Sequence, residues 1–253
     1  MVCAEGGTSY TSEPQPCALS ILTRQRLLDG SLRQVLPMPA HLMWSEAQLA
    51  QSLAETLARQ PGGTGAPIWV FAYGSLIWNP LIATEVDQNA TLTGWRRSFC
   101  MCTVAGRGCP EQPGRMLSLQ PGGATHGVAL RLPQAQAAHE LTLLWRREMG
   151  MGSYRPTWVD VALEGGGSAP AIAFVANPAH PSHEPDDSVH TVARRIAVAC
   201  GAFGPNVDYL TSLHAALRAR GLRDDYVEAV MQAVHSLSPP DVAAQGSTPD
   251  ITG

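Results

Sequence analysis

The sequence of 253 residues contains no lysine, and all seventeen of its basic residues are arginine. The chain therefore has no lysine side chain for Schiff-base chemistry or for use as a general base. It also lacks any run of eighteen or more apolar residues, which a membrane-spanning helix would need. Its first residues show neither the basic nor the apolar segment of a secretory signal. We expect a cytoplasmic protein with no membrane partner.

Cysteine and charge are both sparse. Six cysteines, unevenly spaced in a chain of this length, are too few for a secreted disulfide framework, so reduced thiols are expected. Charged residues make up 15% of the chain, and the net charge of −4 is not concentrated in runs. Nucleic acid is therefore not an expected partner.

What the sequence does contain is a series of strand-like segments between Ile68 and Val175. They are IWVFAYG, ATLTGWRRSFCMC, GRMLSLQ, HGVALRL, WVDVAL and AIAFVA, separated by clusters of Gly and Pro. One helix, QAQAAHELTLLWRREM, interrupts them, and three helices follow a Pro-rich loop. Strands first and helices later predict an α+β domain with a partly closed sheet rather than a repeated βαβ unit.

The N-terminal part reads differently. Residues 1–43 are expected to be a loosely ordered arm with about two helical turns, stopped by prolines. Ser45 can cap an amphipathic helix over SEAQLAQSLAETLARQ, which opens a domain spanning residues 44–237. Residues 238–253 are expected to be a flexible tail, and the protein is expected to be a monomer.

The segment WVFAYGSLIWNP contains the first candidate site. A strand that ends in Gly74 and Ser75 can leave consecutive backbone N–H groups unpaired and directed outward, which suits a carboxylate or a developing oxyanion. An ordinary strand-to-loop turn has the same composition. This motif alone does not decide between the two.

Glu148, in LTLLWRREMGMGSY, is the second candidate. It ends a helix whose apolar face should pack on the sheet, so its carboxylate can lie over the barrel. The alternative is a solvated glutamate paired with Arg146 or Arg147.

The sequence gives less support to metal binding or to covalent catalysis than to these two candidate sites. Cys100, Cys102 and Cys109 form one group, and His180, His183, Asp186 and Asp187 form another. Neither group has a regular four-ligand zinc spacing, so no metal is expected. Ser75 lacks the GxSxG setting of a hydrolase nucleophile.

Several motifs, in this order, resemble the bacterial ChaC-type γ-glutamylcyclotransferases, which act on glutathione. They are WVFAYGSLIWNP, GWRRSFC, GRGCPEQPGRMLSL, GVALRLP, ELTLLWRREMGMGSYRPTW, AIAFVANPAHP and NVDYL. The resemblance implies a γ-glutamylcyclotransferase-like mixed β-barrel with flanking helices. It also implies conversion of glutathione to 5-oxo-L-proline and L-cysteinylglycine without a metal or organic cofactor.

By position, the resemblance assigns the catalytic glutamate to Glu148 and a tyrosine beside the γ-glutamyl group to Tyr209. The substrate loop of the family falls on Ala72, Tyr73, Gly74, Ser75, Leu76 and Ile77. Ala72 replaces a common Gly, and Ser153 replaces the second Gly of a Gly-Gly-Tyr sequence, so both can alter the loop geometry and the rate.

Two further side chains and three further functions stay open. The Tyr154 hydroxyl, like that of Tyr209, can approach the glutamyl group or simply pack. Arg115 can bind the glycine carboxylate of glutathione or form a surface ion pair. The alternative functions are a cyclotransferase for other γ-glutamyl amines or amino acids, a non-enzymatic regulator of cation transport, and a metal-binding module.

Overall fold

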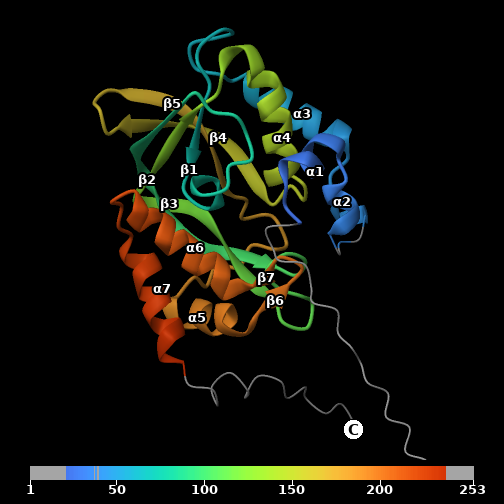
Figure 1. The fold of residues 1–253 in the computed structure, drawn as a ribbon, viewed down its shortest axis with the longest axis vertical. Coiled ribbons are helices and arrows are strands. Elements are labelled where there is room, and N and C mark those ends of the chain that lie inside the picture. The colour runs from blue at the N-terminus through green and yellow to red at the C-terminus, as the bar shows by residue number, and fades with distance from the viewer. Residues whose placement is uncertain (1–20, 37, 39, 238–253) are drawn as a thin grey trace, which may run out of the picture.

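The computed structural model describes residues 21–36, 38 and 40–237 (Figure 1). Five strands form a closed barrel in the order β1-β3-β2-β4-β5. They are β1 (Trp69–Ala72), β2 (Val86–Thr103), β3 (Gly114–Arg131), β4 (Tyr154–Leu163) and β5 (Ser168–Ala176). The β1–β5 pair is parallel and the other pairs are antiparallel. The predicted mixed barrel is confirmed, and its closure goes beyond the partly closed sheet expected from the strand pattern.

Strands β2 and β3 form the longest pair. The sequence predicts two strands, GRMLSLQ and HGVALRL, but the structure joins them into the single strand β3 of 18 residues. Gly122 and Gly123, which suggested a break, have positive φ values of 112° and 63° and lie within the strand. They face a bulge in β2, where the register shifts between Thr93 and Trp95. Such irregularities bend strands, so here the glycines curve the barrel instead of ending a strand.

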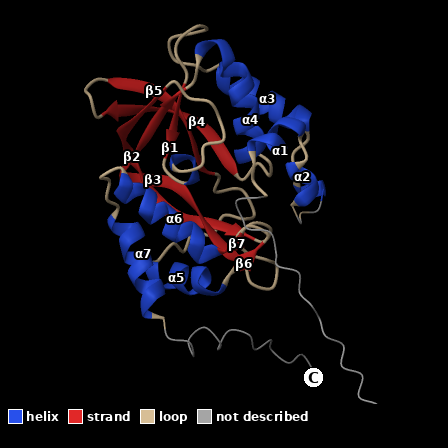
Figure 2. Cartoon of the chain, viewed as in Figure 1, coloured by secondary structure: helices blue, strands red, loops and turns tan. Residues whose placement is uncertain are grey.

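Helices cover the barrel in two groups (Figure 2). One group consists of α1 (Arg24–Asp29), α2 (Leu32–Val35), α3 (Glu46–Leu57) and α4 (Ala137–Glu148). The other consists of α5 (Val189–Val198), α6 (Asn206–Ala219) and α7 (Asp225–Ser236). The short strands β6 (Cys200–Gly201) and β7 (Gly204–Pro205) form a hairpin before α6, and the 3-10 helices η2 (Ala40–Leu42), η3 (Ser75–Ile77) and η4 (Gln134–Gln136) complete the elements.

All four residues of strand β1 are buried. Since successive side chains point to opposite faces of a strand, β1 is covered on both faces. Trp69 and Phe71 join the hydrophobic cluster that continues into α5, α6 and α7. Val70 and Ala72 join the cluster that contains α4 and the N-terminal helices. The residues that follow β1 therefore emerge where the two helix groups meet the barrel.

The N-terminal helices pack against α4. Thr23 caps α1, and Leu27 is 1% exposed within the cluster under α4. Arg24 forms an ion pair with Glu140, a fully buried residue of α4. Ser45 caps α3 as predicted, in a reciprocal arrangement with Gln48. The rest of the predicted arm and the predicted tail lie outside the described residues.

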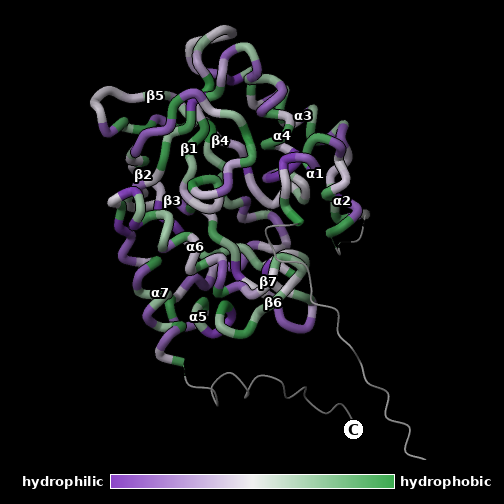
Figure 3. The backbone as a smooth tube through the Cα atoms, viewed as in Figure 1, coloured by the Kyte–Doolittle hydropathy of each residue, from purple (hydrophilic) through white to green (hydrophobic). Residues whose placement is uncertain are grey.

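Hydropathy follows this arrangement (Figure 3), with green and purple alternating along α6 and α7 as expected for helices that bury one face. In the described part of the chain, no helix is both long enough and apolar enough to cross a membrane.

Candidate active site

The turn after β1 exposes backbone donors. Its first internal hydrogen bonds run from Ile77 N–H to Gly74 O (2.9 Å) and from Asn79 N–H to Ser75 O (2.9 Å). The first N–H groups of a helix have no partner within the helix. In keeping with this, the amides of Gly74, Ser75 and Leu76 donate none of the hydrogen bonds found among the described residues. The geometry matches the unpaired donors expected from the sequence.

Arg97, from β2, holds the carbonyl side of this turn. Its side chain is fully buried, and Nε donates to Tyr73 O at 2.8 Å. The other nitrogens bind an Asp224 carboxylate oxygen at 2.8 Å and His126 O at 2.6 Å. Because the guanidinium fixes the carbonyl of Tyr73, the turn has a defined orientation before any ligand arrives.

Tyr209, on α6, faces the turn directly. A Cβ atom at Gly74 would lie 3.0 Å from the Tyr209 hydroxyl oxygen, so the turn has no room for a side chain there. Tyr209 is 5% exposed, and its ring packs edge-on against Trp78 with the centroids 5.5 Å apart. No hydrogen bond of its hydroxyl is found within residues 21–36, 38 and 40–237, and the hydroxyl lies beside the turn.

Glu148, the last residue of α4, lies next to the same turn. Its side chain is 17% exposed and accepts from Arg147 Nε at 2.9 Å. The Arg147 guanidinium also donates to Ser75 Oγ at 2.9 Å and to the carbonyl oxygens of Asn79 and Pro80. One arginine, 3% exposed, thus joins the carboxylate to the turn. The pairing with Arg147 in the alternative interpretation is found, but the Glu148 side chain is mostly buried rather than solvated.

Burial sets the acid–base character of the site. It raises the pKa of the Glu148 carboxyl, while the charge and hydrogen bond of Arg147 act in the opposite direction. Burial also raises the pKa of Tyr73, Tyr154 and Tyr209, and the negative charge of Glu148 adds to each increase. The three phenols therefore stay protonated at neutral pH around a carboxyl that titrates above its usual range.

Two of these tyrosines have protein partners. The Tyr73 hydroxyl donates to Phe174 O, and the Tyr154 hydroxyl donates to Leu117 O at 3.3 Å. Tyr73 therefore anchors the turn to β5. The hydrogen bond of Tyr154 supports the packing alternative, although the residue also lines the cavity.

A cavity of about 270 Å³ connects these groups. Ser75, Trp78, Glu148, Ser153 and Tyr209 lie on its wall, together with residues of α1, α2 and the loop before β3. Concave sites of roughly this size suit small-molecule ligands. Of the remaining residues assigned to the substrate loop, Ala72 and Leu76 are buried in the cluster under α4, and Ile77 is partly buried against it.

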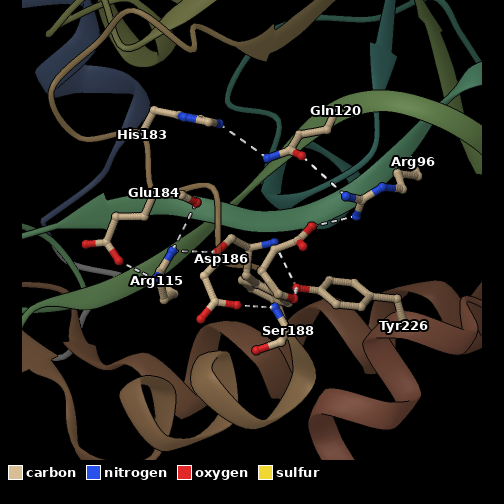
Figure 4. Close-up of polar contacts among 10 residues, drawn as sticks. Arg96, Arg115, Gln120, His183, Glu184, Asp186, Ser188 and Tyr226 are labelled. Atoms are coloured by element: carbon tan, nitrogen blue, oxygen red, sulfur yellow. Dashed lines mark hydrogen bonds and ion pairs between the residues drawn. The ribbon is translucent and has the colours of Figure 1, made fainter.

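Arg115 does not belong to this cavity wall. It is 2% exposed and forms an ion pair with Glu184, whose side chain is 32% exposed, and its Nη1 donates to Phe99 O at 3.3 Å (Figure 4). Of the two expectations for Arg115, the ion pair is found, although the arginine itself is buried rather than on the surface. Its role is to connect β2 with the segment that precedes α5.

The residues weighed as metal ligands have other partners. His183 contacts Gln120, Asp186 accepts from Ser188 N–H at 3.0 Å, and Asp187 pairs with Arg96 at 2.5 Å (Figure 4). Across the described ranges, no group of three or more His, Cys, Asp or Glu side chains could hold a metal ion. The His183 and Asp187 contacts fasten the loop after β5 to β3 and β2, and Cys102 N–H of β2 also donates to Ser182 O at 2.7 Å.

Comparison with solved structures identifies the class. A yeast γ-glutamylcyclotransferase specific to glutathione matches 67% of this chain and 96% of its own, with a TM-score of 0.62 and 22% identity. The barrel and its helices are thus the fold of the γ-glutamylcyclotransferases. The chain belongs to the ChaC-like protein family, whose model matches residues 68–237.

Two curated relatives are similar over most of their length. The glutathione-specific γ-glutamylcyclotransferase of Escherichia coli is 43% identical over 218 residues, which cover 86% of this chain and 94% of the relative. The human glutathione-specific γ-glutamylcyclotransferase 1 is 30% identical over 190 residues, covering 72% and 86% respectively.

Proposed function

We propose that this protein is a glutathione-specific γ-glutamylcyclotransferase, which converts glutathione to 5-oxo-L-proline and L-cysteinylglycine. The observation that carries this proposal is that the Glu148 carboxylate and the donor turn at Ser75 share the Arg147 guanidinium. Two relatives of 43% and 30% identity with this named activity support the choice of substrate. We further propose that the enzyme acts in the cytoplasm as a monomer, without a metal or cofactor.

The chemistry requires a base. The α-amine of the glutamyl group must attack the γ-carbonyl carbon of the same residue, yet an α-amine with a pKa of about 7.7 to 8.0 is mostly protonated near neutral pH. Glu148 removes that proton and later delivers it to the nitrogen of the departing cysteinylglycine. The attacking nitrogen loses a second proton when the ring amide forms, and this proton converts the released amine of cysteinylglycine to its ammonium form. The C–N bond of the five-membered ring forms and the original amide C–N bond breaks, so no other reactant is consumed.

The turn supplies electrostatic stabilisation. Its amides and the Tyr209 hydroxyl can donate to the glutamyl carboxylate and to the oxygen that becomes negative during attack. Because nucleophile and electrophile belong to one molecule, the site needs mainly to hold the glutamyl chain in a conformation close to the ring. The buried, preformed turn suits this requirement.

Replacing Glu148 tests the proposal. Glu148→Gln keeps the shape and hydrogen-bonding capacity of the side chain but removes its basicity, and positioned proton transfer contributes about 10²- to 10⁴-fold. We expect mass spectrometry to detect almost no 5-oxoproline or cysteinylglycine from glutathione with this variant. The exposed Glu164→Gln is the matched control. Turnover above a tenth of the wild-type value would remove Glu148 from the role of base.

Specificity is tested separately, because the same chemistry can act on other γ-glutamyl compounds. We propose that the purified enzyme has a much higher kcat/KM for glutathione than for γ-glutamylalanine. Comparable values would point instead to a cyclotransferase of broad specificity.

A further inference from the structure

Methionines are concentrated at the active-site cavity. Five of them line it, out of eight in the whole sequence, namely Met38, Met43, Met101, Met116 and Met151. They come from the residues between α2 and α3, from strands β2 and β3, and from the loop after α4. Met101 is 3% exposed, whereas the other four side chains are only partly buried. These five residues, the methionine wall, therefore leave apolar surface uncovered at the cavity.

Two members of the methionine wall lie beside the candidate reacting groups. Met101 and Met116 are direct partners across the β2–β3 pair, so their side chains are cross-strand neighbours. Tyr154 and Met116 both pack against the small cluster that contains Met101. The residue after Met116, Leu117, reaches the donor turn, because its Cδ2 would lie 3.6 Å from a Cβ atom on Gly74. This part of the wall therefore adjoins the turn.

Two other members belong to the segments that meet just after the catalytic helix. Met151 lies in the loop after α4, and His180 Nε2 contacts its carbonyl oxygen at 3.1 Å. Met43 precedes Trp44, whose N–H donates to Gly150 O in the same loop at 2.9 Å. The backbone is thus held in place at both methionines, while an unbranched thioether side chain can still adopt several rotamers. The result is an adaptable apolar surface on a fixed base.

The proposed reaction places the cysteinyl side chain of glutathione beside the methionine wall. Glu148 delivers a proton to the cysteinyl nitrogen, so the cysteinyl side chain starts next to that carboxyl. A bare thiol covers little apolar surface, yet the apolar lining continues to Leu22 and Leu36 in the N-terminal segment. An alkyl group on the sulfur would cover more of this lining and remove it from water.

We propose that the methionine wall binds the substituent of S-alkylated glutathione, so that the enzyme also cleaves glutathione thioethers. This inference rests on the proposed function. The glutamyl amine attacks the γ-carbonyl carbon and the amide C–N bond breaks as before, which releases 5-oxo-L-proline and S-alkylcysteinylglycine. The thioether bond is untouched and no further reactant is consumed. Because methionine side chains adapt to differently shaped partners, the accepted class is that of small apolar thioethers rather than one compound.

The test measures release of 5-oxoproline from glutathione and from its S-methyl, S-propyl and S-carboxymethyl derivatives. We expect kcat/KM to rise from glutathione to the S-methyl and then to the S-propyl derivative. Full burial of the two additional methylenes corresponds to an increase of about 15-fold. The S-carboxymethyl group has a similar length but carries a charge, so its kcat/KM should be at least about tenfold below that of the S-propyl derivative.

Substitutions in the methionine wall test where the substituent lies. Met43→Gln and Met116→Gln keep an unbranched side chain of similar length but add a polar group. Each should lower the ratio of kcat/KM for the S-propyl derivative to that for glutathione by about threefold or more. The matched variants Met43→Leu and Met116→Leu keep the wall apolar and should retain the ratio.

Each other outcome contradicts a different statement. A kcat/KM for the S-propyl derivative below a tenth of that for glutathione would overturn the inference, and this result needs only the wild-type enzyme. A preference for the S-carboxymethyl derivative would overturn the apolar character of the subsite. Unchanged ratios in both glutamine variants, with thermal melts that show folded proteins, would place the substituent away from the methionine wall. If the wild-type enzyme released no 5-oxoproline from glutathione itself, the proposed function would fail instead.

Discussion

Glu148 and Arg147 form an ion pair in which Arg147 affects the pKa of Glu148. Burial raises the pKa of Glu148 and Arg147 counteracts that increase. The carboxyl must be ionised to accept a proton, so kcat/KM should rise with pH as Glu148 loses its proton. This acidic limb should lie above the ordinary carboxyl value of about 4.3.

Arg147→Gln should move the acidic limb further toward neutral pH, because the removed charge favours the ionised carboxyl. A pH profile of kcat/KM for glutathione measures the shift. The rate should also fall, since Arg147 holds Ser75, but a structural effect alone would not displace the limb. Arg146→Gln, a neighbouring arginine that pairs with Glu46 instead, should leave the limb in place. If the acidic limb does not shift in Arg147→Gln, it does not report the ionisation of Glu148.

At the residue scale, the sequence predicts the candidate site residues but not the buried arginines that hold them in place. Glu148 and the turn each stand in a short local segment of the sequence, and Tyr209 is assigned by the family resemblance. Arg97 and Arg147 are charged residues that usually face water, and the sequence alone does not identify them as buried supports. Their burial depends on Tyr73 O, Asp224 and Ser75, which meet them only in the folded barrel.

The turn and α6 fit together tightly at one point. In Gly74→Ala, the new methyl group would press on the Tyr209 hydroxyl 3.0 Å away. Overpacking of this kind costs about 1 to 3 kcal/mol, which corresponds to a decrease in Tm of roughly 2 to 10 °C for a chain of this size.

The same Gly74→Ala change should cost less in a Tyr209→Phe background, because the obstructing oxygen is then absent. Thermal melts of the four proteins in this cycle measure the coupling. Additive decreases in Tm would show that the methyl group meets something other than the hydroxyl. Gly150→Ala is a suitable comparison, since a Cβ there would have no neighbour closer than 3.5 Å.

Among the elements, helices are predicted better than strand ends. The predicted helices SEAQLAQSLAETLARQ and QAQAAHELTLLWRREM differ from the observed α3 and α4 by only a few residues, because caps and apolar periodicity are local signals. Gly122 and Gly123 led to a predicted break that the structure does not contain. Whether a glycine ends a strand or bends it depends on its partner strand, which the local sequence does not specify.

At the scale of the whole molecule, Arg24 connects the N-terminal helices to the barrel domain. It forms two bonds, of 2.6 and 2.8 Å, with the fully buried Glu140 and also donates to Leu81 O. Arg24→Ala would leave Glu140 with the Ala83 amide as its remaining partner among the described residues. The Arg24 side chain is 37% exposed, so solvent screens part of this pair, but its removal leaves a buried carboxylate with one partner. We therefore expect Tm to fall by roughly 2 to 5 °C.

This defect should depend on pH in a defined direction. Burial tends to raise the pKa of Glu140, but the hydrogen bond and charge of Arg24 and the Ala83 amide lower it overall. A carboxyl with a lowered folded pKa contributes stability above its unfolded value, about 4.3, and loses it as the pH falls through the folded value. The difference in Tm between wild type and Arg24→Ala should therefore shrink below about pH 4. A constant difference would assign the effect to packing.

The parallel pairing of β1 with β5 affects when the site can form while the ribosome synthesises the chain. The turn that follows β1 needs a strand roughly a hundred residues later to close the barrel, and Tyr209 lies later still. At elongation rates of about 5 to 20 residues per second, a ribosome takes on the order of ten seconds to travel from the turn to Tyr209. During that interval the proposed site is incomplete, because α6 and its Tyr209 have not yet been synthesised.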